Sequence, residues 1–198
     1  MTKYTIELLR CKRTDPNYQD IRNRHYVANR GTHGQQLHYL ILLDQKIVGI
    51  ISGASSVWAV KPRDEYFGLN KDNKKVALPS IINNVVFRLE EHLPNMATQV
   101  LKLWRNRICA DWEDRYKVKV HGFETFVVEE DYRKGSLYKA DNWSFLGITQ
   151  GNTKTHKGLG TPSERVSTTP KLVFAKKIPN TQLSTSYTPT WNIKKVVK

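Results

Sequence analysis

The sequence predicts a single domain of the mixed α/β (α+β) class, in which a sheet is built around one long central helix. Three observations support this class. Apolar residues with strand character run up to Leu89, a long amphipathic helix follows, and strand character returns after Val118. This strand, helix, strand order is typical of a mixed sheet with a helical crossover. With 198 residues, of which 39% are hydrophobic, the chain can build one real core, which excludes disorder over most of its length.

The first thirty residues carry weak signals. Residues 5–10 and 16–30 are polar and are expected to be irregular, apart from a helix around residues 18–28. Asp15-Pro16 is a plausible start for that helix, because Asp caps helices and Pro is favoured in their first turn.

A hairpin is predicted next. Residues 37–43 and 46–53 are short runs rich in β-formers, and the polar pair Asp44-Gln45 separates them. The apolar character continues through residues 56–60 and ends at a loop marked by Pro62, and residues 65–78 are expected to be loop or short helix.

The clearest element pair lies in the middle of the chain. Residues 80–89 are predicted as a strand, and a helix is predicted from Met96 to about Tyr116, with Asn95 as its N-cap. The apolar residues of this helix recur every three or four positions and form one stripe: Ala97, Leu101, Trp104, Ile108, Trp112 and Tyr116.

The C-terminal part returns to strand character. A strand is expected over residues 118–128, a short helix that breaks into a strand over residues 135–148, and a further strand at Leu172–Ala175. One domain over residues 1–178 is the economical interpretation, followed by a basic, flexible tail over residues 179–198.

Charge is distributed unevenly. The net charge is +14, and the last fifty residues contribute +8 of it through nine Lys or Arg against Glu164 alone. The two cysteines, Cys11 and Cys109, lie far apart, so neither a disulfide framework nor a zinc site is expected. No apolar run is long enough to span a membrane and no secretory signal is present, so we expect a soluble, cytoplasmic protein without a membrane partner.

A polyanion is the expected partner, because basic residues lie among aromatic ones near the start and dominate the end of the chain. The alternatives are a solvated face with no ligand, an anionic membrane surface or an acidic protein. The candidate nucleic-acid-binding residues are Arg22, Arg24, His25, Tyr26, Arg30, Arg88, Lys154, Lys157, Lys176 and Lys177.

The order of elements resembles the GNAT acyltransferase fold, and the motifs resemble the DruA-like family within it. These motifs are Arg24-His25-Tyr26, Trp58 with Lys61-Pro62-Arg63-Asp64, Asn83-Asn84 with Phe87, Asn95-Met96-Ala97, Glu124-Thr125-Phe126, and Tyr138-Lys139-Ala140-Asp141-Asn142-Trp143 followed by Gly147 to Gly151. The resemblance covers residues 22–178. DruA-like proteins occur in the Druantia anti-phage defence system and beside some transposases. The Mom-type DNA-modification proteins are a more distant resemblance.

The resemblance implies a crevice with catalytic candidates Glu124, Tyr138, Asn84 and Asn83. Glu124 would act as a general base or hold a metal or water, and Tyr138 would protonate a departing thiolate. Successive strand side chains point to opposite faces, so only one of the two asparagines faces the crevice with Glu124. A buried Arg88 would need an anionic partner, either Glu124 or a substrate phosphate, whereas Arg63-Asp64 is interpreted as an ordinary loop ion pair.

A donor site is implied less clearly. The cofactor-binding candidates are Asn95, Met96 and Ala97, at the turn that would receive the pyrophosphate of acyl-CoA. This turn carries Glu90, Glu91 and a proline but no glycine, which opposes acyl-CoA binding and leaves the cofactor undetermined. His25 is a weak metal candidate. Relatives usually follow Glu-Thr-Phe-Val with an aspartate, whereas Val128 stands here.

We therefore expect a DNA-directed GNAT-like transferase that modifies a base by group transfer, in a phage, mobile-element or anti-phage defence setting, together with partner proteins of that system. The alternative is a non-catalytic nucleic-acid-binding module that keeps the fold and has lost acyl-CoA chemistry. Buried structural amides for Asn83 and Asn84, and a packed tyrosine for Tyr138, are the corresponding interpretations of the site residues. A third alternative is an acyltransferase for small molecules or proteins.

Overall fold

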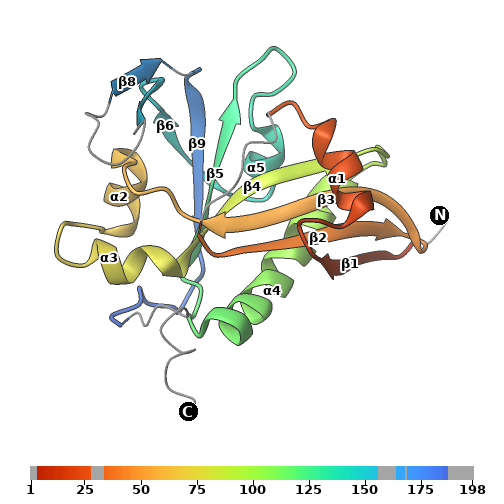
Figure 1. The fold of residues 1–198 in the computed structure, drawn as a ribbon, viewed down its shortest axis with the longest axis horizontal. Coiled ribbons are helices and arrows are strands. Elements are labelled where there is room, and N and C mark those ends of the chain that lie inside the picture. The colour runs from red at the N-terminus through yellow and green to blue at the C-terminus, as the bar shows by residue number, and fades with distance from the viewer. Residues whose placement is uncertain (1–3, 28–33, 156–163, 168, 187–198) are drawn as a thin grey trace.

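The computed structural model describes residues 4–27, 34–155, 164–167 and 169–186 (Figure 1). The elements follow the chain in this order: β1 (Ile6–Cys11), α1 (Pro16–Asn23), β2 (Gln36–Leu43), β3 (Lys46–Ser55), α2 (Lys61–Phe67), α3 (Lys74–Ala77), the 3-10 turn η1 (Leu78–Ser80), β4 (Ile81–Leu89), α4 (Met96–Tyr116), β5 (Gly122–Val128), α5 (Ser136–Ala140), β6 (Ser144–Ile148), β7 (Asn152–Thr155), β8 (Glu164–Ser167) and β9 (Lys171–Lys177). This confirms the mixed α/β class and the long central helix.

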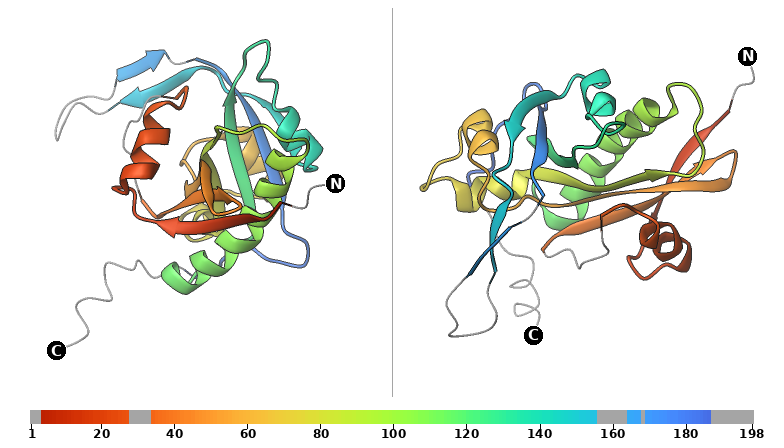
Figure 2. Two further views of the ribbon diagram at one scale, coloured as in Figure 1. Left: turned by 90° about the vertical axis from the view of Figure 1, so that its right-hand side faces the viewer. Right: turned by 90° about the horizontal axis from the view of Figure 1, so that it is seen from above.

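Seven strands form one mixed sheet in the order β1-β2-β3-β4-β5-β9-β6. All neighbours in it are antiparallel except β4 and β5, which are parallel and are joined through α4. Seen from above, α4 and α5 lie on one side of the sheet and α1 on the other (Figure 2). The sheet is therefore covered on both faces, as its apolar central strands require.

The main core lies between the sheet and α4. The predicted stripe is confirmed for five of its six residues: Leu101, Trp104, Ile108 and Trp112 are fully buried against the sheet and Tyr116 is buried in the same core, whereas Ala97 is half-buried. Gly53 of β3 makes room for two of them: a Cβ there would come within 2.4 Å of the Ile108 side chain and 3.1 Å of the Trp104 ring. A smaller cluster packs α1 against the other face through Tyr18 and Ile21.

The predicted hairpin is confirmed. Asp44 and Gln45 both adopt positive φ, at 47° and 67°, as a tight two-residue turn between right-twisted strands requires. The start of α1 is also as predicted, because the Asp15 side chain accepts hydrogen bonds from the backbone N–H groups of Asn17 and Tyr18. The helix ends at Asn23, well before residue 28.

Several expectations were wrong. Residues 5–10 are not irregular, because most of them belong to the edge strand β1. The segment around Pro62 begins α2 rather than a loop, with Pro62 in the first turn, where its missing N–H costs nothing. The strand expected from residue 118 begins only at Gly122.

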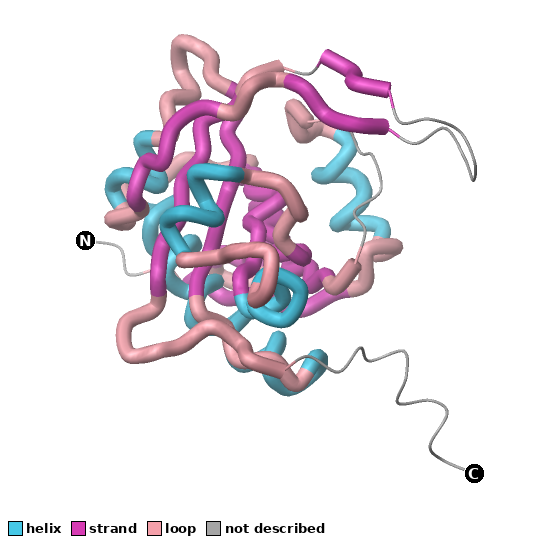
Figure 3. Tube along the Cα trace, turned by 90° about the vertical axis from the view of Figure 1, so that its left-hand side faces the viewer, coloured by secondary structure: helices cyan, strands magenta, loops and turns pink. Residues whose placement is uncertain are grey.

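The C-terminal region contains more regular structure than expected. The strand at Leu172–Ala175 is the middle of β9, which lies inside the sheet between β5 and β6. The preceding strands β7 and β8 pair with each other as a separate two-stranded sheet at the periphery (Figure 3). In the described part of the chain, no helix is long and apolar enough to cross a membrane.

Candidate functional site

A gap opens where β4 and β5 diverge. The two strands pair only over Ile81–Asn83 and Gly122–Glu124, after which β4 and β5 run apart (Figure 1). Beyond the last pair, no hydrogen-bonded ladder closes the sheet between them. A parallel pair that separates in this way leaves main-chain groups of both strands free to face a ligand.

A β-bulge lies at this point of divergence. Ser52 of β3 pairs with Val86 and Gly53 pairs with Asn84, so Val85 has no partner residue on β3. The extra residue also reverses the faces of β4: Ile82 packs in the α4 core, whereas Val86 packs in the α1 cluster. Val85 is therefore the bulged residue of β4, next to Asn84, at the point where β4 leaves β5.

A pocket of about 220 Å³ occupies the gap. It lies between the segment that follows α1 and the segment around α5. Its lining residues are His25, Tyr26, Val27, Asn84, Val85, Phe87, Thr125, Phe126, Val127, Tyr132, Arg133, Gly135, Ser136, Leu137 and Tyr138. Of the predicted site residues, the structure thus brings together His25, Tyr26, Asn84 and Tyr138.

Tyr138 is tied to both diverging strands. Its Oη donates to Asn84 Oδ1 on β4 at 2.8 Å and lies 3.4 Å from Thr125 Oγ1 on β5. Thr125 donates in turn to the Asn84 carbonyl at 3.0 Å, and Asn84 Nδ2 donates to the Ser52 carbonyl at 3.0 Å. The phenol is therefore held in one place at the point where the strands separate.

Burial raises the pKa of Tyr138 above its ordinary value, and the hydrogen bond with Thr125 opposes this only in part. The hydroxyl consequently keeps its proton at neutral pH. A fixed, protonated phenol at the wall of a pocket can donate a hydrogen bond or a proton to a ligand oxygen or sulfur that replaces Asn84 Oδ1 as its acceptor.

His25 is neutral in the fold. Burial lowers its pKa to about 4, and the positive charge of Arg22 acts in the same direction. The Val27 N–H donates to Nδ1 at 3.1 Å, so the ring proton lies on Nε2. The described residues contain no group of three or more His, Cys, Asp and Glu that would hold a metal ion.

Arg133 is a pocket residue that the sequence did not point to. Its guanidinium carbon lies 3.6 Å from the centre of the Tyr26 ring and 5.0 Å from that of Tyr132, and it pairs with Glu130. Its Nε is buried and has no acceptor within the described ranges. The Glu130-Asp131-Tyr132-Arg133 run places an aromatic residue and a base just before the Gly135 turn, but it does not indicate that Arg133 lies beside Tyr26.

Glu124 does not face this pocket. It is fully buried and pairs with the equally buried Arg63, with Oε2 2.5 Å from Nη1, and its Oε1 accepts from the Val57 N–H at 3.3 Å. Burial raises its pKa, while the Arg63 charge, Ser56 and the Val57 N–H oppose the rise.

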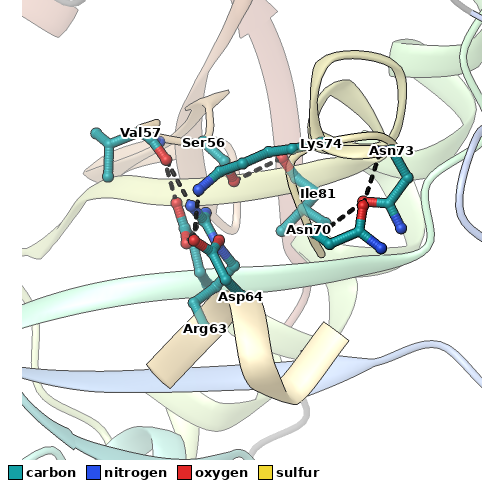
Figure 4. A network of polar contacts seen from close by, with 9 residues as sticks. Ser56, Val57, Arg63, Asp64, Asn70, Asn73, Lys74 and Ile81 are labelled. Carbon is teal, nitrogen blue, oxygen red and sulfur yellow. Dashed lines mark hydrogen bonds and ion pairs between the residues drawn. The ribbon is translucent and has the colours of Figure 1, made fainter. Parts of the chain in front are cut away.

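Arg63 has further partners besides Glu124. It also donates to the Val57 carbonyl at 2.6 Å and to Asp64 at 2.7 Å, and Asp64 in turn pairs with Lys74 (Figure 4). The network joins α2, α3, β5 and the loop after β3. The expected Arg63–Asp64 ion pair is therefore present, but it belongs to helix α2 and to a buried network and not to a loop.

The two asparagines lie on opposite faces, as predicted. Asn83 is in register with Glu124 and shares its face, whereas Asn84 faces Tyr138. The expectation that one asparagine joins both Glu124 and Tyr138 in a single crevice was wrong, because the sheet separates them. Glu124 was also wrong as a partner for Arg88, which pairs with Glu90 at 2.5 Å.

Some of the predicted nucleic-acid-binding residues are bonded within the fold, some are exposed, and some are not described. Arg22 is buried and donates to the Val27 carbonyl at 2.7 Å, and Lys176 donates to the carbonyls of Asp141 and Asn142. Arg24 and Lys177 are exposed, although Arg24 pairs with Asp20 at 2.8 Å. Lys154 lies on β7, whose side chains are not described, and Arg30 and Lys157 lie outside the described residues.

The turn before α4 does not fit the pyrophosphate of acyl-CoA. Glu91 pairs with Lys46 at 2.8 Å, and Glu90 pairs with Arg88 and with Arg24, so carboxylates already occupy the cations around the turn. The Met96 side chain is fully buried in the core. Asn95 does occupy the N-cap position, yet it has a φ of 61° and makes no side-chain capping hydrogen bond. Ala97, half-buried, is the remaining candidate at this turn.

Solved structures similar to this chain are acetyltransferases. One is a Bacillus subtilis acetyltransferase in complex with CoA, 10% identical, with a TM-score of 0.54 over 89% of this chain and 99% of that one. Another is a GNAT family acetyltransferase from Elizabethkingia anophelis with acetyl-CoA bound, 9% identical, with a TM-score of 0.51 over 87% and 98%. At these identities the likeness shows the fold, which is GNAT-like.

A third likeness is more partial. It is to a Salmonella typhimurium acetyltransferase that modifies the N-terminal serine of ribosomal protein L7/L12, 12% identical, with a TM-score of 0.45. It covers 73% of this chain but 65% of that one, so this chain spans less than two thirds of that enzyme. No curated protein matches the sequence.

The family is shown by the sequence itself. The family described as Druantia protein DruA matches residues 2–167, which include every strand of the sheet but β9 and every residue of the pocket. Together with the GNAT-like sheet, this match confirms the resemblance drawn from the motifs. The chain belongs to the DruA family, the family of a Druantia defence protein.

Proposed function

We propose that this chain is a DNA-directed transferase of the Druantia defence system, which modifies a nucleobase by group transfer in the pocket between β4 and β5. The observation that carries the proposal is the Tyr138 hydroxyl, fixed on Asn84 at the wall of the pocket. This group supplies a function that group transfer needs, because a phenol can protonate a leaving group.

The choice of nucleic acid as acceptor is supported by charge and by the pocket lining. A net charge of +14 attracts a polyanion. The pocket lining is aromatic and offers an amide, a guanidinium and a phenol, which are the groups that recognise the edge and the face of an extruded base. The donor is expected to be held by the pocket itself, because the turn before α4 has no place for a pyrophosphate.

The second candidate is a non-catalytic nucleic-acid-binding module. One observation favours it: Glu90 and Glu91 lie in the turn before α4, which would receive the donor's phosphates in a GNAT enzyme, and both are paired with cations of the protein. A chain that had lost its donor would retain the pocket and the basic surface and would bind nucleic acid without turnover.

Mass spectrometry of nucleosides separates the two candidates. DNA is isolated from cells that express the wild-type chain or Tyr138→Phe, and its hydrolysed nucleosides are compared. We expect a new nucleoside in the wild type and its loss in the variant, which removes the proton donor and keeps the ring. Tyr66→Phe, which removes a hydroxyl outside the pocket, is the matched control and should retain the product. An unmodified profile together with salt-dependent DNA binding would support the module.

A further inference from the structure

We propose that a single nucleobase, unstacked from its strand, is held at the mouth of the β4/β5 pocket by four planar side chains, His25, Tyr26, Arg133 and Tyr132, called here the planar row. The inference rests on the proposed function, since it names the class of group that enters the same pocket. The base is placed at the mouth of the pocket and not beside Tyr138.

The four groups lie next to one another. The His25 and Tyr26 rings are stacked, with their centres 4.5 Å apart and their planes inclined by 27°. The Arg133 guanidinium lies 3.6 Å from the Tyr26 ring centre, and the Tyr132 ring centre lies 5.0 Å from the same guanidinium. A row of stacked π systems with a cation in it is the arrangement on which single-stranded nucleic acids place their bases.

The outer end of the row is open. Tyr132 is 78% exposed and Tyr26 is 45% exposed, although both line the pocket. Exposing an aromatic ring to water does not stabilise a monomer. A ring with one exposed face at the mouth of a pocket can instead stack with a further planar ring. The base is therefore expected to stack on Tyr132, at the solvent side of the row.

Two donors in the row lack acceptors in the described part of the chain. One is Arg133 Nε, which is buried. The other is His25 Nε2, which carries the ring proton because Nδ1 accepts from Val27. Both N–H groups are left available to acceptors of a ligand that enters the pocket, such as ring nitrogens or carbonyl oxygens.

Cations lie close to the row. The charges of Arg22, Arg88 and Arg133 all lower the pKa of His25, and Arg88 and Arg133 are paired with Glu90 and Glu130. A phosphate backbone that replaced these acids at the guanidinium groups would be held at the mouth, and the base it carries would reach Tyr132 from solvent. An adenine ring belonging to a nucleotide cofactor has the same stacking chemistry, and the experiment must distinguish it.

Fluorescence anisotropy tests the inference on the full chain. Two dye-labelled oligonucleotides of equal length are compared, one fully abasic and one with a single base in an otherwise abasic strand. We expect the single base to tighten binding to the wild type by about 5- to 150-fold, the range of one base–aromatic contact. Tyr132→Ala should abolish this gain and leave the affinity for the abasic strand unchanged. Tyr132→Phe should retain it.

Matched controls decide the result. Phe145 is an aromatic residue, 50% exposed on β6 and outside the pocket, so Phe145→Ala should keep the full gain. Equal affinity of the wild type for both strands, or an undiminished gain in Tyr132→Ala, would overturn the inference. Loss of the gain on adding free CoA would also overturn it, because the row would then serve the adenine of a cofactor. A Tyr132-dependent gain without any modified nucleoside would support the row and contradict the transferase.

Discussion

At the scale of single residues, Glu124 and Arg63 form a fully buried ion pair. Both side chains are fully buried, and each also bonds the backbone of Val57. Charges in such a place are tolerated only because each has its partner. The sequence analysis proposed Glu124 as catalytic. It could not predict that Arg63, 61 residues earlier in the chain, forms an ion pair with Glu124 in the core.

We predict that Arg63→Met lowers the free energy of unfolding by about 3–5 kcal/mol, since it leaves a carboxyl group buried without its cation. The double variant Arg63→Met/Glu124→Leu should recover most of this loss, because it removes both charges. Urea denaturation of the two variants measures the difference. Equal losses in both would show that side-chain packing, and not charge pairing, sets the stability here. Glu91→Gln, at the exposed Lys46 pair, should have no measurable effect.

His38 makes the stability depend on pH. It is buried, its Nδ1 lies 3.1 Å from Tyr18 Oη and 3.0 Å from Ser52 Oγ, and burial lowers its pKa to about 4. The unfolded chain binds this proton near pH 6.5 and the folded chain only near pH 4. The contribution of neutral His38 to the free energy of unfolding is therefore complete above about pH 6.5. It is lost as the pH falls toward 4.

We predict that the free energy of unfolding falls between pH 6.5 and 4 and that His38→Gln flattens this slope by up to about 1.4 kcal/mol per pH unit, which is the linkage of one proton. Urea denaturation at a series of pH values gives both slopes. His25 has a lowered pKa of about 4 as well, so some slope should remain in the variant. An unchanged slope in His38→Gln would contradict the assignment.

At the scale of elements, the sequence predicted what depends on local pattern. The apolar stripe of α4, the hairpin turn at Asp44-Gln45 and the strand β4 follow from periodicity and turn chemistry, and all three are confirmed. β1 was missed because an edge strand needs only one neighbour and its six residues include Glu7 and Arg10. α2 was missed because Pro62 breaks a helix in its interior but is favoured in its first turn.

The position of α5 depends on Gly135. This residue is at the N-cap of α5 with a φ of 69°, and a Cβ there would lie 2.3 Å from the Phe174 ring. Phe174 stacks in turn on Tyr138, with ring centres 5.8 Å apart. The close approach of the backbone to β9 thus sets the place of the phenol.

We predict that Gly135→Ala destabilises the fold more than Gly68→Ala does, by about 1–3 kcal/mol, the cost of overpacking. Both glycines have a positive φ, 69° and 72°, so the backbone strain is shared. A Cβ at Gly68 meets nothing within 4 Å, which isolates the clash with Phe174. Urea denaturation measures the difference, and equal losses would show that strain alone matters.

At the scale of the whole molecule, the sheet determines which candidate residues share a face. The bulge at Val85 and the divergence of β4 from β5 are properties of strand register, which no residue pattern encodes. Sequence reasoning therefore found Asn84 and Tyr138 but grouped them with Glu124 on the other face. Arg133 was missed for the same reason, because only the fold brings the segment after β5 next to Tyr26.

The fold also determines which charges remain available to a polyanion. Two adjacent lysines of β9 show this. Lys176 gives its ammonium group to the carbonyls of Asp141 and Asn142, and partial burial lowers its pKa. Lys177 is exposed and lies 4.9 Å from the centre of the Tyr66 ring. Successive strand residues point to opposite sides, so one charge serves the structure and the other faces solvent.

We predict that Lys177→Gln, and not Lys176→Gln, weakens the salt dependence of DNA binding. Each phosphate contact contributes about −0.9 to the slope of log K against log salt, so losing one contact should reduce its magnitude by about 0.9. Fluorescence anisotropy with a short duplex over a series of salt concentrations measures the slope of each variant. Lys176→Gln should instead lower the free energy of unfolding. If both variants keep the wild-type slope, the phosphates do not contact β9. If the wild type does not bind DNA at low salt, nucleic acid is not the partner.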